Sequence, residues 1–169
     1  RALTVEEIQD VVEAFAEGAV RTRAAGFDAV EIHGAHGYLI NQFLSPLTNK
    51  RTDKYGGDVK GRTRFLLEIL ELTREKVGSD YPILCRINGD DYIEGGLTLE
   101  EAKKIAQMLE AAGVDALHIS GGIYDSPLPV TTGPMALPRG HMVHLAMAIK
   151  KVVSVPVIAV GRINDPELA

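Results

Sequence analysis

AAGFDAVEIHG at residues 24–34 and AAGVDALHISG at residues 111–121 are one pattern that occurs twice in the chain. In each copy a helical segment closes at a glycine, Gly26 or Gly113, the residue type that most readily takes the left-handed conformation after a helix. A short strand and a turn of small residues follow. The repeat therefore predicts a helix–strand unit that recurs along the chain.

Two further strands are predicted outside the repeat. One begins at Pro82, in PILCRING, and the other at Val155, in VPVIAVGRIN, and each reaches a glycine. A first helix is marked by the capping box from Thr4 to Glu7. The alternation of helices and strands predicts parallel strands joined by right-handed crossovers. The helical patterns between the strands cover about residues 61–77, 98–112 and 140–153.

The spacing of the repeat favours an α/β barrel. The two copies lie two strands apart, and in a (β/α)8 barrel alternate strands fill common interior layers. Four strands cannot close such a barrel, so we expect residues 1–169 to form about four units of one domain, without an internal boundary. Both ends look cut, and Asp165 and Pro166 resemble the start of another helix. The alternative is a doubly wound sheet, although no G-x-G-x-x-G follows a strand.

Composition and charge narrow the class of protein. With 46% hydrophobic and 24% charged residues the chain is typical of a globular domain, and a net charge of -5 without tryptophan argues against nucleic-acid binding. No apolar run reaches the roughly 20 residues of a membrane span, and no signal peptide is recognisable. The single cysteine, Cys85, suits a reducing cytoplasm. We expect a cytoplasmic protein with a small-molecule partner, and we leave a homo-oligomer open.

The carboxyl ends of the predicted strands are where a barrel of this kind carries its chemistry. Arg86 is the most informative residue there, because Cys85 and Ile87 on either side would face the helices and send the guanidinium into the barrel. A buried, permanently charged guanidinium requires an anionic partner. Polar and small residues gather at the four ends, and they are His33, His36 and Tyr38; Arg86 and Asn88; Ser120, Gly121 and Gly122; and Gly161 and Arg162.

Glycines at two of these ends indicate a phosphate. Gly121, Gly122 and Gly161 would let a ligand approach backbone N–H groups, and a helix expected after Gly161 would direct the positive end of its dipole at an anion. An anionic cofactor that carries phosphate satisfies both these glycines and Arg86.

Three stretches resemble the old yellow enzyme family, the FMN-dependent NAD(P)H:flavin oxidoreductases. They are residues 26–57, residues 88–102 (NGDDYIEGGLTLEEA) and residues 155–167 (VPVIAVGRINDPE), and the first contains an H-x-x-H-x-Y signature. The resemblance covers essentially the whole chain and implies strands 4 to 7 of an FMN-binding TIM barrel. It is closest to the enoate reductase, 2,4-dienoyl-CoA reductase and bile-acid-modifying branch, whose longer proteins continue into a 4Fe-4S site and an FAD region.

The resemblance also implies roles for individual residues. His33 and His36 would hydrogen-bond the carbonyl or carboxylate oxygen of an α,β-unsaturated substrate, whose β carbon accepts hydride from flavin N5. Tyr38 would donate a proton to the α carbon. Arg86 would lie beside flavin N1 and the C2 carbonyl. The residues expected to bind cofactor are then Arg86, Gly161, Arg162, Gly121 and Gly122.

Several of these residues also have structural interpretations. H-x-x-H could bind a metal, but a third ligand is needed and only Glu31 faces the same way, so we expect no metal site. Arg86 could pair with Glu31, and Cys85 is expected in the core. In the polar run 48–64, the residues expected to fix the loop rather than to contact ligand are Tyr55, Arg51 and Arg62.

Two other functions are compatible with the same sequence. The chain could belong to a different phosphate-binding barrel enzyme, of the aldolase or decarboxylase type, in which Gly161 and Arg162 hold a substrate phosphate. No lysine lies at a predicted strand end, which disfavours Schiff-base chemistry. The segment could also be a catalytically silent half-barrel.

Overall fold

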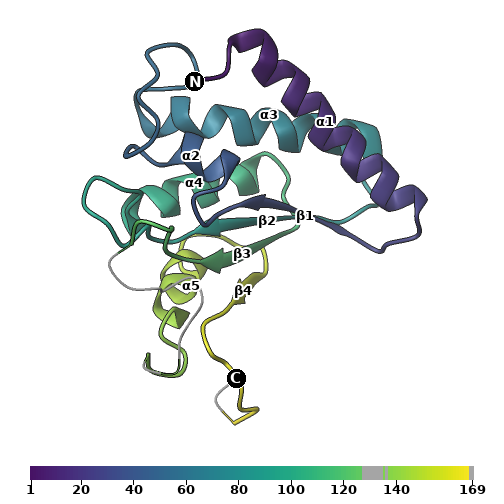
Figure 1. The fold of residues 1–169 in the computed structure, drawn as a ribbon. Helices are drawn as coiled ribbons and strands as arrows, with labels where there is room; N and C mark the ends of the chain where they lie inside the picture. Colours follow the sequence, from purple (N-terminus) through teal and green to yellow (C-terminus); the bar gives the residue numbers. More distant parts are fainter. Residues whose placement is uncertain (127–134, 136, 168–169) are drawn as a thin grey trace.

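The structure, a computed structural model, describes residues 1–126, 135 and 137–167. Helices and strands alternate along the chain, with one additional short helix (Figure 1). The elements are α1 (Val5–Ala24), β1 (Val30–Gly34), α2 (Leu39–Leu44), α3 (Val59–Val77), β2 (Ile83–Asn88), α4 (Leu99–Ala111), β3 (Ala116–Ser120), α5 (Val143–Lys150) and β4 (Val157–Ala159).

The four strands form one parallel sheet in the order β1-β2-β3-β4. This confirms the predicted parallel strands. The order follows the chain without a reversal, whereas a doubly wound sheet reverses its strand order at a switch point. The register places Arg86 of β2 between His33 of β1 and His118 of β3. Because all strands run the same way, their carboxyl ends meet at one edge of the sheet.

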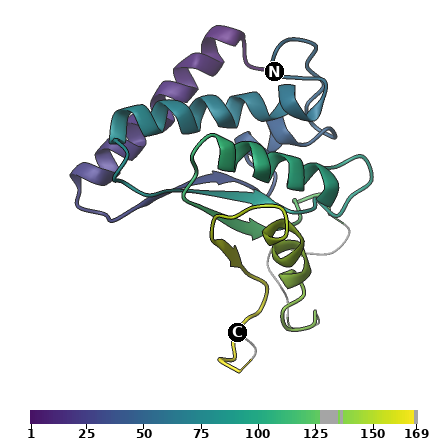
Figure 2. The same ribbon diagram turned by 180° about the vertical axis from the view of Figure 1, so that it is seen from behind.

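Helices α3, α4 and α5 lie on the same side of the sheet, as Figures 1 and 2 show from front and back. Strand residues that face the helices are buried, among them Ile32, Cys85 and Ile119. Cys85 is fully buried, which confirms it as a core residue, and burial raises the pKa of its thiol. We call the opposite side the inner face, and it carries Glu31, His33, Leu84, Arg86 and His118.

The predicted helix ends are largely confirmed. Thr4 and Glu7 form a reciprocal capping box at the start of α1. Gly26 and Gly113 follow α1 and α4 with φ of 85° and 88°, the left-handed conformation expected from the repeat. Helix α3 begins two residues before the predicted position 61, because Asp58 caps it by accepting a hydrogen bond from Gly61 N.

Other boundaries differ from the prediction. Helix α2 was not predicted, because six residues are too few for a helical period to be recognised. Helix α5 is shorter than residues 140–153, since Gly140 has a φ of 69° that no α-helix continues through. The helix expected after Gly161 is absent from residues 161–167, where Arg162 has a φ of 56°. Asp165 Oδ1 accepts from Glu167 N as an N-cap would, and the two residues that follow lie outside the described part.

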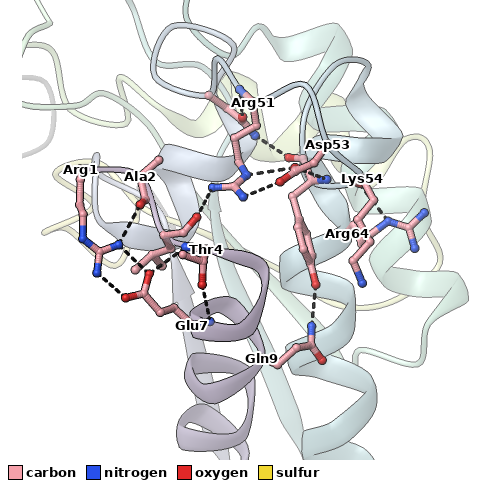
Figure 3. Close-up of polar contacts among 12 residues, drawn as sticks. Arg1, Ala2, Thr4, Glu7, Gln9, Arg51, Asp53, Lys54 and Arg64 are labelled. Carbon is pink, nitrogen blue, oxygen red and sulfur yellow. Dashed lines mark hydrogen bonds and ion pairs between the residues drawn. The ribbon is translucent and has the colours of Figure 1, made fainter.

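The polar loop after α2 is fixed to the start of α1 (Figure 3). Arg51 pairs with Asp53 and donates to Leu3 O at 2.7 Å. Tyr55 is fully buried, with its hydroxyl hydrogen-bonded to Glu68 at 2.8 Å. Arg62, 5% exposed, donates to Leu44 O at 2.9 Å and pairs with Glu101. The interpretation of Arg51, Tyr55 and Arg62 as residues that fix this loop is confirmed.

Gly61 should respond to substitution in the opposite sense to an ordinary helical glycine. Alanine normally stabilises a helix interior by about 0.5 to 1 kcal/mol relative to glycine. A Cβ at Gly61, however, would lie 2.0 Å from Gly56 O, whereas a Cβ at Gly18 in α1 would have no neighbour nearer than 3.8 Å. We expect Gly61→Ala to destabilise by about 1 to 3 kcal/mol and Gly18→Ala to stabilise. Thermal melts of the full-length variants, compared with wild type, check both signs; a gain from Gly61→Ala would contradict the packing.

Candidate active site

The three residues predicted to act on substrate lie together at the carboxyl edge of the sheet. His33 is near the end of β1, and His36 and Tyr38 follow in the turn before α2. The His33 ring centroid lies 5.2 Å from that of His36 and 5.4 Å from that of Tyr38. The residues lie at this edge because the carboxyl ends of all four parallel strands meet there. The tight turn at Gly37, which has a φ of 79°, brings His36 and Tyr38 back over His33.

The backbone of His36 is strained and held. Its φ of 62° lies in the left-handed region, which costs a non-glycine residue free energy. Asn88 Oδ1, at the end of β2, accepts a hydrogen bond from His36 N at 3.3 Å, and Asn41 Oδ1, in α2, accepts one from Gly37 N at 2.6 Å. Two side-chain amides therefore fix the turn that carries the histidine.

Both amides are oriented by one buried carboxylate. Asp91 is fully buried, and its Oδ1 accepts from Asn88 Nδ2 at 2.8 Å and from Asn41 Nδ2 at 3.4 Å. Its Oδ2 accepts from Leu97 N at 2.9 Å. Because a carboxylate only accepts, the amide nitrogens face Asp91 and the amide oxygens face the histidine turn. We call Asn41, Asn88 and Asp91 the buried amide–carboxylate triad.

The triad also reaches the loop after β3, since Asn88 Nδ2 donates to Gly122 O at 3.1 Å. Sequence reasoning placed Asn88 at a strand end but gave it no role, and it missed Asn41 and Asp91. The available signal was a set of short polar residues in otherwise apolar surroundings. Their connection depends on contacts across about 50 residues of sequence, which no local pattern reveals.

The side chain of His36 is linked to Arg86 through Ser120. Ser120 Oγ lies 2.8 Å from His36 Nε2 and accepts from Arg86 Nε at 3.2 Å. Ser120 is 1% exposed, so this hydroxyl is shielded from solvent. The arginine predicted to contact cofactor and a histidine predicted to contact substrate therefore share one buried hydroxyl.

Arg86 does not pair with Glu31, contrary to the structural alternative. Glu31 instead accepts from His118 Nδ1 at 2.9 Å. Within the part of the chain that the structure describes, no carboxylate lies within ion-pair distance of Arg86. Glu31 thus reaches across β2 to His118, which the register aligns with Arg86 and His33. The positive charge of Arg86 therefore lies near the carboxyl edge of the sheet without a carboxylate partner among the described residues.

Both histidines are held in the neutral form near pH 7. Burial, followed by the positive charge of Arg86, lowers the pKa of His36 to about 4. The same two causes, in the same order, lower the pKa of His33, while Glu31 opposes them. A neutral imidazole donates one hydrogen bond and accepts another. The pair can therefore donate to a substrate oxygen without carrying charge.

Tyr38 is the exposed end of the cluster, with 48% of its surface accessible. Its hydroxyl lies 2.6 Å from that of Tyr124, which follows β3 and is 78% exposed. This hydrogen bond raises the pKa of Tyr124. Tyr124 was not predicted, because nothing in its local sequence connects it with a residue so far along the chain. The phenol of Tyr38 thus has a solvent-facing hydroxyl beside it.

Arg162 and the three predicted cofactor glycines are placed by contacts within the chain. A Cβ at Gly121 would lie 2.8 Å from the Tyr92 ring, and Gly122 N donates to Asp90 O at 2.8 Å. A Cβ at Gly161 would lie 3.0 Å from Met142 N. Arg162 donates from Nη1 to the carbonyls of Leu137 and Met135. These contacts give each residue a packing role, and cofactor binding by them stays a prediction.

The described residues contain no group of three or more His, Cys, Asp or Glu side chains that could hold a metal ion. Across the same ranges, no helix has both the length and the apolar character needed to cross a bilayer.

Comparison with known proteins finds one family model that matches the whole chain. The family model described as NADH:flavin oxidoreductase / NADH oxidase matches residues 1–169. A protein named NADH oxidase from Thermoanaerobacter brockii is 54% identical over 169 residues, which is 100% of this chain and 26% of that protein.

Solved structures of similar proteins include reductases of the same kind of fold. A 2-naphthoyl-CoA reductase in complex with 2-naphthoyl-CoA matches with a TM-score of 0.95 and 41% identity, over 99% of this chain and 26% of that one. An old yellow enzyme homologue from Zymomonas mobilis matches with a TM-score of 0.73 and 31% identity, over 93% of this chain and 42% of that one. The chain therefore spans about a quarter of the length of two of these three relatives and under half of the third.

Proposed function

Because the chain belongs to the NADH:flavin oxidoreductase / NADH oxidase family, we propose that the whole protein is an ene-reductase that uses FMN and NAD(P)H. Its substrate would carry a C=C bond activated by a carbonyl, carboxylate or thioester group. The observation that carries this proposal is the convergence of His33, His36 and Tyr38 at the same edge of the sheet as the unneutralised Arg86.

Family membership confirms the predicted resemblance to old yellow enzymes and the predicted fold class, an α/β chain that forms part of a (β/α)8 TIM barrel. It also supports a flavin-dependent oxidoreductase over the aldolase or decarboxylase alternative. We propose that residues 1–169 are part of a single FMN-binding domain. The 4Fe-4S and FAD regions would lie in the rest of the protein, since the chain matches only 26% of the relative named NADH oxidase. The buried lone thiol of Cys85 supports a cytoplasmic location.

The residues present fit FMN. Arg86 offers a guanidinium that has a hydroxyl partner and no carboxylate partner among the described residues, as expected of a group that meets an anionic cofactor. Gly161 and Arg162 would lie toward the phosphate, and Gly121 and Gly122 would border the same cofactor. Bound FMN would pass hydride from NAD(P)H to the β carbon of the substrate.

The histidine pair would bind the substrate's activating oxygen. Two neutral N–H donors aimed at one oxygen stabilise the negative charge that develops there, and they do so without the reorganisation that water requires. Tyr38 would then protonate the α carbon, and its contact with Tyr124 places a hydroxyl on its solvent side.

The absorption spectrum of the full-length protein as purified tests the proposal first. We expect flavin bands in the visible, bleached by NADH or NADPH under anaerobic conditions and restored by an unsaturated carbonyl compound. A protein without flavin bands would exclude this function and return the phosphate-binding alternatives. Bands that NAD(P)H bleaches but no unsaturated compound restores would retain the flavin and exclude the substrate class.

Replacing Arg86 tests the cofactor contact. If the guanidinium lies against the flavin, Arg86→Met should lower the midpoint potential, because the lost charge stabilises the reduced, more negative form of the cofactor. A drop of about 30 mV corresponds to about 1.4 kcal/mol for a two-electron couple. Arg86→Lys is the matched control, since it keeps the charge, and its potential should lie nearer to wild type. An unchanged potential in Arg86→Met with FMN fully bound would make the arginine structural.

A further inference from the structure

Ser120 occupies a position that the proposed reaction has not used. The described part of the chain gives its hydroxyl two side-chain partners, Arg86 Nε at 3.2 Å and His36 Nε2 at 2.8 Å. At 1% exposure the hydroxyl cannot turn to bulk water. The hydroxyl hydrogen therefore needs an acceptor among these two partners.

The two partners differ in what they can accept. A guanidinium N–H only donates and cannot be deprotonated in a protein, so Arg86 Nε gives its hydrogen to Ser120 Oγ. The buried O–H then needs an acceptor, and His36 Nε2 is the one partner that can serve. The hydrogen bonds therefore run in one direction, from Arg86 to Ser120 and from Ser120 to His36. Nε2 of His36 carries the lone pair, and the ring hydrogen lies on Nδ1.

We propose that Ser120 is a positioning residue that holds His36 in the tautomer with hydrogen on Nδ1, so that the Nδ1–H is the donor left for the substrate oxygen. The tautomer follows from the chain's own contacts alone. The use of Nδ1–H by substrate rests on the proposed function.

The backbone of His36 is held by contacts that do not involve Ser120. Asn88 and the rest of the buried amide–carboxylate triad hold the His36 N–H and the turn after it. The Cα–Cβ bond of His36 is thus set independently of Ser120. Loss of the serine hydroxyl should change the ring hydrogen's location more than the ring's position, which separates this role from a merely structural one.

Solid-state ¹⁵N NMR of the full-length holoenzyme, labelled at histidine, measures the tautomer directly. The His36 signals are identified by their loss in His36→Gln. We expect a protonated-type shift at Nδ1 and an unprotonated-type shift at Nε2 in wild type, a mixture or reversal in Ser120→Ala, and the wild-type pattern again in Ser120→Thr, which keeps the hydroxyl.

Ser45→Ala is the matched control, because Ser45 is also buried but its Oγ has no hydrogen-bond partner among the described residues. It should leave the His36 shifts unchanged. Wild-type shifts that place the hydrogen on Nε2, or shifts that do not move in Ser120→Ala, would overturn the proposal.

Benzoate binding to the oxidised holoenzyme tests the consequence for substrate. Loss of a correctly oriented donor should weaken benzoate about tenfold in Ser120→Ala, equivalent to about 1.4 kcal/mol, with FMN content unchanged. An altered tautomer with unchanged benzoate affinity would support Ser120 as the residue that sets the tautomer and would overturn the assignment of His36 to the substrate oxygen. An altered affinity with an unaltered tautomer would overturn the role of Ser120.

Discussion

Tyr38→Phe in the full-length enzyme is expected to slow reduction of the unsaturated substrate by about 10² to 10⁴-fold, the usual contribution of a positioned general acid. FMN should stay bound and should still be reduced by NAD(P)H at the wild-type rate. The reason is that the phenol lies at the exposed end of the histidine cluster, where its hydroxyl meets that of Tyr124 at 2.6 Å. It is assigned to protonation of substrate carbon and has no part in the first half-reaction.

Stopped-flow measurements of the two half-reactions check this result separately. Tyr81→Phe is the matched control, because the Tyr81 hydroxyl is buried and lacks a hydrogen-bond partner within the described ranges. That variant should leave both half-reactions unchanged. Equal slowing of both half-reactions in Tyr38→Phe would count against a role as proton donor.

Replacing both His33 and His36 with Ala should weaken the binding of phenolic or carboxylate ligands by at least about 10²-fold, since each donor to a charged oxygen contributes about 1.5 to 3 kcal/mol. FMN affinity should change much less, because both rings are assigned to the substrate. The pKa of His36 is lowered to about 4, and that of His33 is lowered too. His36 therefore stays neutral above about pH 6, and its titration should not alter ligand affinity from there to pH 8.

Equilibrium titration of the oxidised holoenzyme with such a ligand measures the loss. His144→Ala provides the control, as His144 lies on α5 with an exposed side chain away from the cluster. Release of FMN from the double variant, or loss of a bound divalent metal, would contradict the assignment of the pair to substrate.

The repeated helix–strand pattern predicted most of the fold. Gly26 and Gly113 marked two helix ends correctly because a left-handed residue after a helix has few alternatives to glycine. The alternation around Arg86 correctly separated the core face from the inner face. Helix α2 was missed because Leu39–Leu44 is shorter than two turns, and the extent of α5 was overestimated because the left-handed Gly140 was counted as helical.

The candidate site was predictable where one local motif contains it and unpredictable where distant segments meet. His33, His36 and Tyr38 lie within six residues of sequence and were found together. The partner of Glu31 was not, because the choice between Arg86 and His118 depends on the register of three strands. The partners of Asp91 and Ser120 were not predicted either, because their contacts join strand ends and loops that only the folded sheet brings together.

The buried amide–carboxylate triad has a consequence for how this protein can evolve. Asn41 lies in α2, after β1, while Asn88 ends β2 and Asp91 follows it. Through Gly122 the triad also reaches the segment that follows β3. Substitutions in these three segments are therefore epistatic, because a change that suits one of them alters the hydrogen-bond demands on the other two. Grafting a single loop from a relative would fail unless the triad came with it. We expect substitutions in these loops to be tolerated as linked exchanges rather than singly.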